Sequence, residues 1–272
     1  MTLTSNEVDG YLGYGFAGPF NALSEEDLVR FRQELESFET LQGALLSELP
    51  GQIRAKTHLI LPWMQELIRQ PLILDAVQSI IGPNILVYHL TCWVKEPGDH
   101  AYVSWHQDSA YFFLDPPEHV TAWIALSDAT KKSGCLKVLP GSHHNGPLHH
   151  NKGDPLNNLL SNGQYVDAKG LEAAEFLEVR AGQFTLHHTD LVHSSAPNQS
   201  TDRRIGIGVS YIPTHVRCNH GHRLTATLVR GQDRFNYFDV EEPPRDVFEA
   251  RAVAHHADAT RRFFSNHGSE RT

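Results

Sequence analysis

A mainly β protein with flanking helices is the fold class that this sequence predicts, for two reasons. Between residues 84 and 230, short runs of β-branched and aromatic residues alternate with turn signals. Helical periodicity is confined to the stretch before residue 84 and to residues 246–264. Short strands with helices gathered outside them are typical of an antiparallel barrel or sandwich with a helical flank. We expect one domain over residues 1–272, with a helical flank (about 1–83), a barrel core (about 84–230) and a C-terminal helix (about 246–264).

The N-terminal flank contains two predicted helices. Ser24 is a good N-cap, acidic residues follow it, and apolar residues then recur at helical spacing, which predicts a helix over Glu25–Thr40. A second helical pattern runs from about Trp63 to Ile81 and ends before a Gly-Pro pair. Residues 1–22 are rich in glycine and aromatic side chains, and we expect them to drape over the core. The polar stretch from Arg54 to His58 is interpreted as a solvated loop, with contact to an anionic substrate as the alternative.

The core consists of short predicted strands separated by turns. In chain order they are Ile85–Lys95, Tyr102–Asp108, Val120–Leu126, Leu136–Leu139, Phe176–Val179, Gln183–His188, Arg204–Ile212 and, at an edge, Thr225–Val229. Residues 145–175 lack this alternation and carry Gly, Pro and Asn loop signals. Loops of such length in compact domains are usually functional, so we expect a partly structured lid beside the site.

Composition excludes several classes of function. The formal net charge is −9 and no Lys/Arg cluster stands out, so neither nucleic acid nor an anionic membrane is an expected partner. Cys92, Cys135 and Cys218 are far apart and form no disulfide framework or zinc knuckle. No apolar stretch has transmembrane length, and the N-terminus lacks a signal-peptide pattern. We therefore expect a cytoplasmic protein that acts on a small molecule.

A candidate metal site is formed by His106, Asp108 and His193. On a strand, residues i and i+2 point to the same face, so the imidazole of His106 and the carboxylate of Asp108 can bind one ion. A third ligand from a distant strand would complete the two-histidine, one-carboxylate triad of Fe(II) oxygenases, which leaves positions open for a cosubstrate and O2. His187 and His188 compete with His193 for the third position. Taken alone, the H-x-D pair is also compatible with a surface histidine beside a surface aspartate.

Two arginines follow the distal histidine. Arg203 and Arg204 open the apolar run Ile205–Ile212, which is predicted to be a buried strand. A guanidinium on such a strand requires a bidentate anionic partner, and a dicarboxylic cosubstrate would supply one. The strand start is therefore a candidate cosubstrate site.

The chain from Trp105 onward resembles the phytanoyl-CoA dioxygenase family of Fe(II)- and 2-oxoglutarate-dependent enzymes. The resemblance is carried by Trp105-His-Gln-Asp108, the strand Val120–Leu126, the segment Gly134–His143, and the run His193-Ser-Ser-Ala-Pro-Asn-Gln-Ser200 followed by Arg204. It implies a double-stranded β-helix core, and it favours His193 as the third ligand because the family's distal motif follows that residue. Arg204 stands eleven positions after His193, the spacing that the family uses, so Arg203 is expected to face away.

The same resemblance implies the cofactors and the reaction. Fe(II) would be the metal and 2-oxoglutarate and O2 the cosubstrates, with succinate and CO2 released as a substrate C–H bond is hydroxylated. Arg204 would pair with the distal carboxylate of 2-oxoglutarate, while Ser195 and Trp123 would line it, with core packing as the alternative for Trp123. Gln107, between the first two ligands, would also touch the cosubstrate. Asp108 favours hydroxylation, since related halogenating enzymes carry a small residue at that position.

The substrate is expected to be a small polar metabolite, because the sequence offers no basic surface for the phosphates of a CoA thioester. The chain is also similar to bacterial members of the family that act on small secondary metabolites and on phosphonates. We expect α-hydroxylation of an aminoalkylphosphonate such as 2-aminoethylphosphonate. The candidate substrate contacts are His89, Tyr102, Tyr111, Arg54 and Lys56. Hydroxylation of another small secondary metabolite, a non-catalytic cupin-like metal-binding module and a zinc-dependent hydrolase are the alternatives.

Overall fold

Three β-sheets and seven α-helices make up the residues described by this computed structural model, which are 1–160, 163–219 and 221–267. The seven-stranded sheet has the strand order β1 (Phe16–Asn21), β8 (Gln183–His188), β5 (Val120–Ala125), β10 (Arg204–Pro213), β2 (Ile85–Lys95), β12 (Thr225–Arg230) and β13 (Asp239–Val240). The four-stranded sheet has the order β3 (Val103–His106), β9 (His193–Ser195), β6 (Leu136–Val138) and β7 (Glu175–Leu177), and β11 (Arg217–Cys218) pairs with β4 (Leu114–Asp115). The protein is thus mostly β, as predicted.

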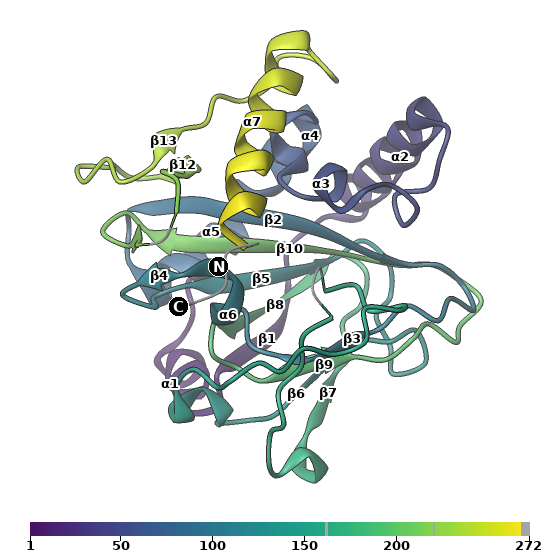
Figure 1. Cartoon of the computed structure of the whole chain (residues 1–272), viewed down its shortest axis with the longest axis vertical. Helices are drawn as coiled ribbons and strands as arrows, with labels where there is room; N and C mark the ends of the chain where they lie inside the picture. Colours follow the sequence, from purple (N-terminus) through teal and green to yellow (C-terminus); the bar gives the residue numbers. More distant parts are fainter. Residues whose placement is uncertain (161–162, 220, 268–272) are drawn as a thin grey trace.

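The α-helices are α1 (Ser5–Tyr14), α2 (Glu25–Gln42), α3 (Gly51–Arg54), α4 (Pro62–Leu67), α5 (Pro71–Ile81), α6 (Ser109–Phe112) and α7 (Ala250–His267). Short 3-10 turns occur at η1 (Thr57–Leu59), η2 (Ser142–Asn145) and η3 (Leu171–Ala173). Figure 1 shows the four-stranded sheet on one side of the seven-stranded sheet, and α2, α3 and α4 on the other side. Across the described residues, no helix has the length and apolar character required to cross a bilayer.

The predicted helices are confirmed with two corrections. The Ser24 side chain caps α2 by accepting a hydrogen bond from the backbone N–H of Asp27. The single helix expected over residues 63–81 is two helices, because Pro71 cannot continue α4 and instead starts α5. The N-terminal segment does more than drape over the core: a capping box at Thr4 starts α1, and residues 16–21 form the edge strand β1 against β8.

The predicted strands are confirmed to within a few residues, with one exception. The strand expected over Tyr102–Asp108 is limited to β3, so it ends at His106 and Asp108 lies beyond it. The distinction matters because the two-residue strand period does not explain how Asp108 reaches the site. The chain turns after His106, and Asp108 has helical dihedrals (φ −62°, ψ −33°) at the start of α6.

The four neighbouring strands β8, β5, β10 and β2 are largely buried on both faces, and strand alternation assigns each residue to one face. On β10, Ile205 and Ile207 pack with helix residues such as Phe31 and Val77 in the main hydrophobic core. Alternate residues on the other face of the sheet include Trp123, which packs in a second cluster with residues of the four-stranded sheet. The polar side chains of the site occupy this second face, between the two sheets.

Two glycines on β10 make this inner face possible. A Cβ atom on Gly206 would lie 2.0 Å from the Trp123 ring, and one on Gly208 would lie 3.0 Å from the Trp93 indole nitrogen. The first distance is shorter than side-chain contacts permit and the second is tight, so each glycine makes room for a tryptophan of a neighbouring strand. The repeated Ile-Gly pattern in residues 205–208 therefore specifies an apolar face toward the helices and an aromatic face toward the site.

Candidate active site

His106, Asp108 and His193 converge on one point. His106 at the end of β3 pairs directly with His193 at the start of β9, and the turn into α6 brings Asp108 beside them. The Nε2 atoms of His106 and His193 lie 3.5 Å and 3.7 Å from Oδ1 of Asp108. One potential ligand atom from each residue lies within 4.8 Å of the other two. This is close enough for a single ion to contact all three.

Hydrogen bonds orient both imidazoles toward this point. Nδ1 of His106 lies 2.9 Å from the carbonyl oxygen of Ser104, and Nδ1 of His193 lies 2.9 Å from that of Leu191. A carbonyl oxygen only accepts, so each Nδ1 carries the proton and each Nε2 presents its lone pair to the site. Metal-bound histidines are commonly fixed through such bonds to their other ring nitrogen.

The protonation states suit metal binding. Burial alone would raise the pKa of Asp108, but the neighbouring His106, His187 and His193 imidazoles hold that pKa well below its usual range. Burial, together with the nearby His106, lowers the pKa of His193 well below its usual value. At neutral pH Asp108 is therefore a carboxylate and His193 a neutral imidazole, which are the forms that bind metal. Two imidazole nitrogens and one carboxylate oxygen are the donor set of non-heme Fe(II) oxygenases.

The competing histidines have different positions. His187 lies next to the triad, with Nε2 3.4 Å from Oδ2 of Asp108, which also accepts a 2.8 Å hydrogen bond from the Thr121 hydroxyl. His188, on the other face of β8, accepts a hydrogen bond through Nδ1 from the backbone N–H of Asp190. Among the described residues, only the His106, Asp108 and His193 group meets the distance criterion for a shared ion.

A narrow cavity adjoins the triad and contains Arg204. Its lining includes Trp93, Val103, His106, Asp108, Thr121, Trp123, Leu136, His187, His193, Ser195 and Arg204. Arg204 is only 2% exposed, its guanidinium lies 5.4 Å from the centre of the Trp123 ring, and its Nε has no hydrogen-bond partner. No carboxylate in the described residues pairs with it, and burial lowers its pKa to about 10. Its one hydrogen bond in the described residues runs from Nη1 to the carbonyl oxygen of Trp93 at 3.4 Å, so most of the guanidinium stays available to a carboxylate from a ligand.

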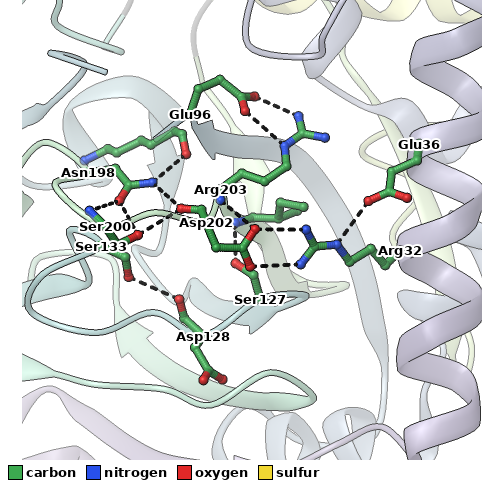
Figure 2. Close-up of polar contacts among 12 residues, drawn as sticks. Arg32, Glu36, Glu96, Ser127, Asp128, Ser133, Asn198, Ser200, Asp202 and Arg203 are labelled. Carbon is green, nitrogen blue, oxygen red and sulfur yellow. Dashed lines mark hydrogen bonds and ion pairs between the residues drawn. The ribbon is translucent and has the colours of Figure 1, made fainter. Parts of the chain in front are cut away.

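Arg203 has the opposite environment. It binds Glu39 through both Nη atoms at 2.7 Å and donates from Nε to Glu96 at 3.1 Å. Figure 2 shows Arg203 beside Glu96, in a network that also includes Asp202 and Asn198. Adjacent arginines on one strand therefore have different roles: Arg203 is satisfied by the protein, whereas Arg204 is not.

Gln107 does not face the cosubstrate cavity, contrary to the prediction. Its side-chain amide donates to the carbonyl oxygens of Gly146 and Asp190, and its Oε1 accepts from the backbone N–H of Leu148. It is fully buried, and these three bonds hold the segment after Asn145 against the chain before His193. Because all three partners are backbone atoms distant in sequence, no local pattern around Gln107 indicates this role.

Lys56 is also unavailable to a substrate. It is 1% exposed, its Nζ lies 2.6 Å from Oε1 of Glu241, and it donates to the carbonyl of Thr225. His58 approaches the other oxygen of Glu241 at 3.1 Å. The stretch expected to be a solvated loop is therefore largely buried from residue 55 onward, because a carboxylate far along the chain neutralises it. We call Lys56, His58, Glu241, Thr225 and Thr227 the paired charge cluster.

A larger cavity of about 450 Å³ opens beside His106 and Asp108. Its lining is Gly51, Gln52, Arg54, Ala55, His89, Thr91, Trp93, His106, Asp108, Tyr111, Phe112, Pro155, Asn158, Leu159, Leu160, Phe263 and Phe264. Arg54, His89 and Tyr111, three of the residues predicted to contact the substrate, line it, whereas Tyr102 lines neither cavity. Phe263 of α7 stacks on His89 with ring centres 3.9 Å apart. The sequence alone gave no reason to place α7 here.

The segment 145–175 lies alongside β3. The backbone N–H of Leu159 donates to the carbonyl of Tyr102, and that of Val166 to the carbonyl of Trp105, both at 2.8 Å. Residues 155 and 158–160 line the larger cavity. The segment is therefore beside the site, as predicted, while its closing motion stays a prediction.

The larger cavity combines one cation, Arg54, with a mostly apolar lining. Arg54 forms no ion pair in the described part of the chain, and its buried Nε has no hydrogen-bond partner. Burial lowers its pKa. The side chains around it are mostly aromatic or aliphatic.

Comparisons with known proteins agree with this geometry. The family model described as phytanoyl-CoA dioxygenase matches residues 11–206. A 236-residue stretch is 28% identical to L-proline trans-4-hydroxylase of Streptomyces griseoviridis, covering 78% of this chain and 88% of that protein. A 156-residue stretch is 30% identical to a probable alpha-ketoglutarate-dependent hypophosphite dioxygenase of Stutzerimonas stutzeri, covering 57% of this chain and 54% of that protein. The chain spans only 42% and 54% of the length of the first curated relatives that it matches.

A solved structure resembles this fold over nearly its whole length. The apo form of the non-heme monooxygenase ThoJ aligns with a TM-score of 0.84 and 27% sequence identity. The alignment covers 95% of this chain and 96% of that one.

Proposed function

This chain belongs to the phytanoyl-CoA dioxygenase family of Fe(II)- and 2-oxoglutarate-dependent oxygenases, and from that premise we propose that it hydroxylates a C–H bond of a small molecule. The observation that carries the proposal is the convergence of His106, Asp108 and His193 beside a buried Arg204 that pairs with no carboxylate in the described residues. The two facing sheets support a double-stranded β-helix as the core of a single domain.

In this proposal the chain's residues position the reactants. His106, Asp108 and His193 hold iron, and the Thr121 hydroxyl fixes the second oxygen of Asp108. When bound, iron and 2-oxoglutarate supply the oxidation: the keto acid and O2 give succinate and CO2, and one oxygen atom enters the substrate C–H bond. The protein orients that bond and excludes water.

The cosubstrate would lie in the narrow cavity. Arg204 pairs with the distal carboxylate, because it is the buried cation there that lacks a protein carboxylate. Trp123 and Ser195 line the same space, and the tryptophan ring also supports the guanidinium. A protein carboxylate on Arg204 would have blocked this use, as Glu39 does for Arg203.

For the substrate we propose a molecule with one anionic group and an apolar body. Arg54 is suited to the anionic group, and Phe112, Leu159 and Phe263 to the apolar body. A cavity of about 450 Å³ lies within the range of roughly 300–1,000 Å³ that accommodates drug-sized ligands. An aminoalkylphosphonate such as 2-aminoethylphosphonate stays a candidate, supported by Arg54 and by the relative named for hypophosphite. With Lys56 neutralised by Glu241, the cavity has fewer cations for a dianion than expected, which favours a monoanion.

The test begins with the reaction class. Anaerobic protein with Fe(II) and 2-oxoglutarate should develop the weak visible charge-transfer band of the chelate, and Asp108→Ala should lose it. A zinc-dependent hydrolase would ignore 2-oxoglutarate, and a metal-binding module would form no succinate. Succinate release is then measured with a panel that contains 2-aminoethylphosphonate and arylalkyl carboxylates. A full rate of hydroxylation in Asp108→Ala would refute the proposed ligand set.

A further inference from the structure

A second buried basic residue lies beside Arg204. Lys95, the last residue of β2, is the direct register partner of Arg204 across the β2–β10 pair. Directly opposed residues in an antiparallel pair project to the same face. Lys95 is fully buried, and in the described ranges it forms no ion pair with an aspartate or glutamate. Two adjacent charges buried without a protein anion are costly, so one of them loses its charge unless a ligand anion neutralises them.

The Lys95 ammonium group has three oxygen neighbours. Its Nζ donates to the carbonyl of Ser195 at 3.2 Å, to the Ser195 hydroxyl oxygen at 2.7 Å and to the carbonyl of Ala196 at 2.6 Å. Three acceptors match the three protons of an ammonium group. Burial, and next the charge of Arg204, lower the pKa of Lys95 to about 6, while Asp99 opposes that shift. At neutral pH the ligand-free protein therefore holds Lys95 mostly as a neutral amine, and an anion bound beside Arg204 would favour the charged form.

The bond to Ser195 determines what that hydroxyl can do. A hydroxyl has one proton to donate, and the Ser195 oxygen already accepts from Lys95. Ser195 also lines the narrow cavity that contains Arg204. Its own proton is therefore available to an acceptor in that cavity, next to the guanidinium.

We propose that Lys95 is a positioning residue of the cosubstrate site, which makes the Ser195 hydroxyl a donor and adds a second positive charge behind Arg204. This inference rests on the proposed use of 2-oxoglutarate. Its consequence is selectivity: the site favours a keto acid with a distal carboxylate over one that lacks it. Lys95 acts through Ser195 and through its charge, without touching the metal-binding triad.

A purely structural role for Lys95 makes a different prediction. In that case the side chain would only tie β2 to residues 195–196. These segments are also held together without the Lys95 side chain, because the Asn198 amide donates to the carbonyl oxygens of Lys95 (3.0 Å) and Asp202 (2.8 Å). Figure 2 shows Asn198 among these bonds with Ser200 and Asp202. We therefore expect Lys95→Met to fold, since an apolar side chain of similar length removes a buried charge.

The experiment compares two keto acids. Calorimetry measures the binding of 2-oxoglutarate and of 2-oxobutanoate, which has no distal carboxylate, to Fe(II)-loaded protein without oxygen. Lys95→Met should lower the affinity for 2-oxoglutarate by about 10-fold or more, which is the usual effect of losing a hydrogen bond to a charged group. Affinity for 2-oxobutanoate should stay within about twofold. Ser195→Ala should reproduce this pattern. In the double variant, the fold-loss in affinity for 2-oxoglutarate should be smaller than the product of the two single fold-losses.

The outcomes separate the two proposals. Equal losses for both keto acids in Lys95→Met, or no loss for either, overturn the role of Lys95 and leave the proposed reaction intact. Wild-type protein that binds neither keto acid overturns both proposals. If Lys95→Met fails to fold, Ser195→Ala decides the question alone, because it keeps both carbonyl bonds of Lys95. Unchanged selectivity in Ser195→Ala then refutes the inference.

Discussion

The molecule contains two groups of buried basic residues. In one group the chain itself provides the anion, and in the other no described carboxylate does. In the paired charge cluster, Glu241 accepts from Lys56 and from the Thr225 and Thr227 hydroxyls, and it contacts His58. Around Arg204 and Lys95, no aspartate or glutamate of the described residues fills that place. Burial alone therefore does not identify a binding site. A buried cation indicates a ligand only where the chain provides no counterion of its own.

The largest effect is expected from removing the anion of the paired charge cluster. Glu241→Ala leaves Lys56 buried without a partner, and breaking a buried pair in this way costs about 3–5 kcal/mol. The free energy of unfolding, measured with urea, should fall by that amount. The control Arg251→Ala removes a solvent-exposed partner of Glu242 and should change stability by less than about 1 kcal/mol. If both variants lowered the free energy of unfolding equally, the proposed difference between the buried and the exposed ion pair would be wrong.

Removing Arg204 should have the reverse profile. Arg204→Met deletes a buried cation that pairs with no carboxylate of the described residues, so the free energy of unfolding should stay the same or rise. Affinity for 2-oxoglutarate should fall by about 2–5 kcal/mol, which is roughly 30- to 5,000-fold. Calorimetry and urea unfolding on the same variant measure both quantities.

The neighbouring arginine provides the matched control. Arg203→Met breaks the bonds to Glu39 and Glu96, so it should lower stability and leave the affinity for 2-oxoglutarate nearly unchanged. If Arg203→Met weakened 2-oxoglutarate more than Arg204→Met, the assignment of faces on β10 would be wrong.

The stabilisation that the paired charge cluster provides should be lost at acidic pH and should be complete at neutral pH. Burial raises the pKa of Glu241, but the Lys56 charge and the His58 contact outweigh burial and lower that pKa below its usual value. A lowered folded-state pKa gives stabilisation that is present above the unfolded value of about 4.3 and is lost as the pH falls below it. Urea unfolding between about pH 7 and pH 3.5 should show this loss. Glu241→Gln should flatten it, and an identical pH profile in that variant would count against the cluster.

The smallest effect is expected in the segment 145–175. Its bonds to β3 are backbone bonds at the rim of the cavity, so its amides should exchange quickly in the free protein. Protection should increase when Fe(II), 2-oxoglutarate and a substrate are all bound, and a shortened segment should release succinate in excess of hydroxylated product. Unchanged exchange together with normal coupling would show that the segment does not close.

Sequence patterns correctly predicted the features that depend on local periodicity, such as strands and the faces of their residues. Alternation along residues 204–212 placed Arg204 on a buried strand, and the H-x-D pair with the distal histidine identified the residues that converge. The means of convergence was not predictable, because Asp108 reaches the site through a turn rather than along a strand. Gln107 and Lys56 were misassigned because their partners, at residues 146–190 and at Glu241, lie far away in sequence. Long-range partners determine whether a polar residue is available, and local patterns do not record them.

The wall that α7 contributes gives the site an order of assembly during translation. Chains emerge from the ribosome N-terminus first, so His193 and Arg204 leave it well before Phe263 and Phe264. The residues that line the narrow cavity are therefore all synthesised before the aromatic side chains that α7 adds to the larger cavity. Substrate selection is in this sense the last property that the growing chain acquires.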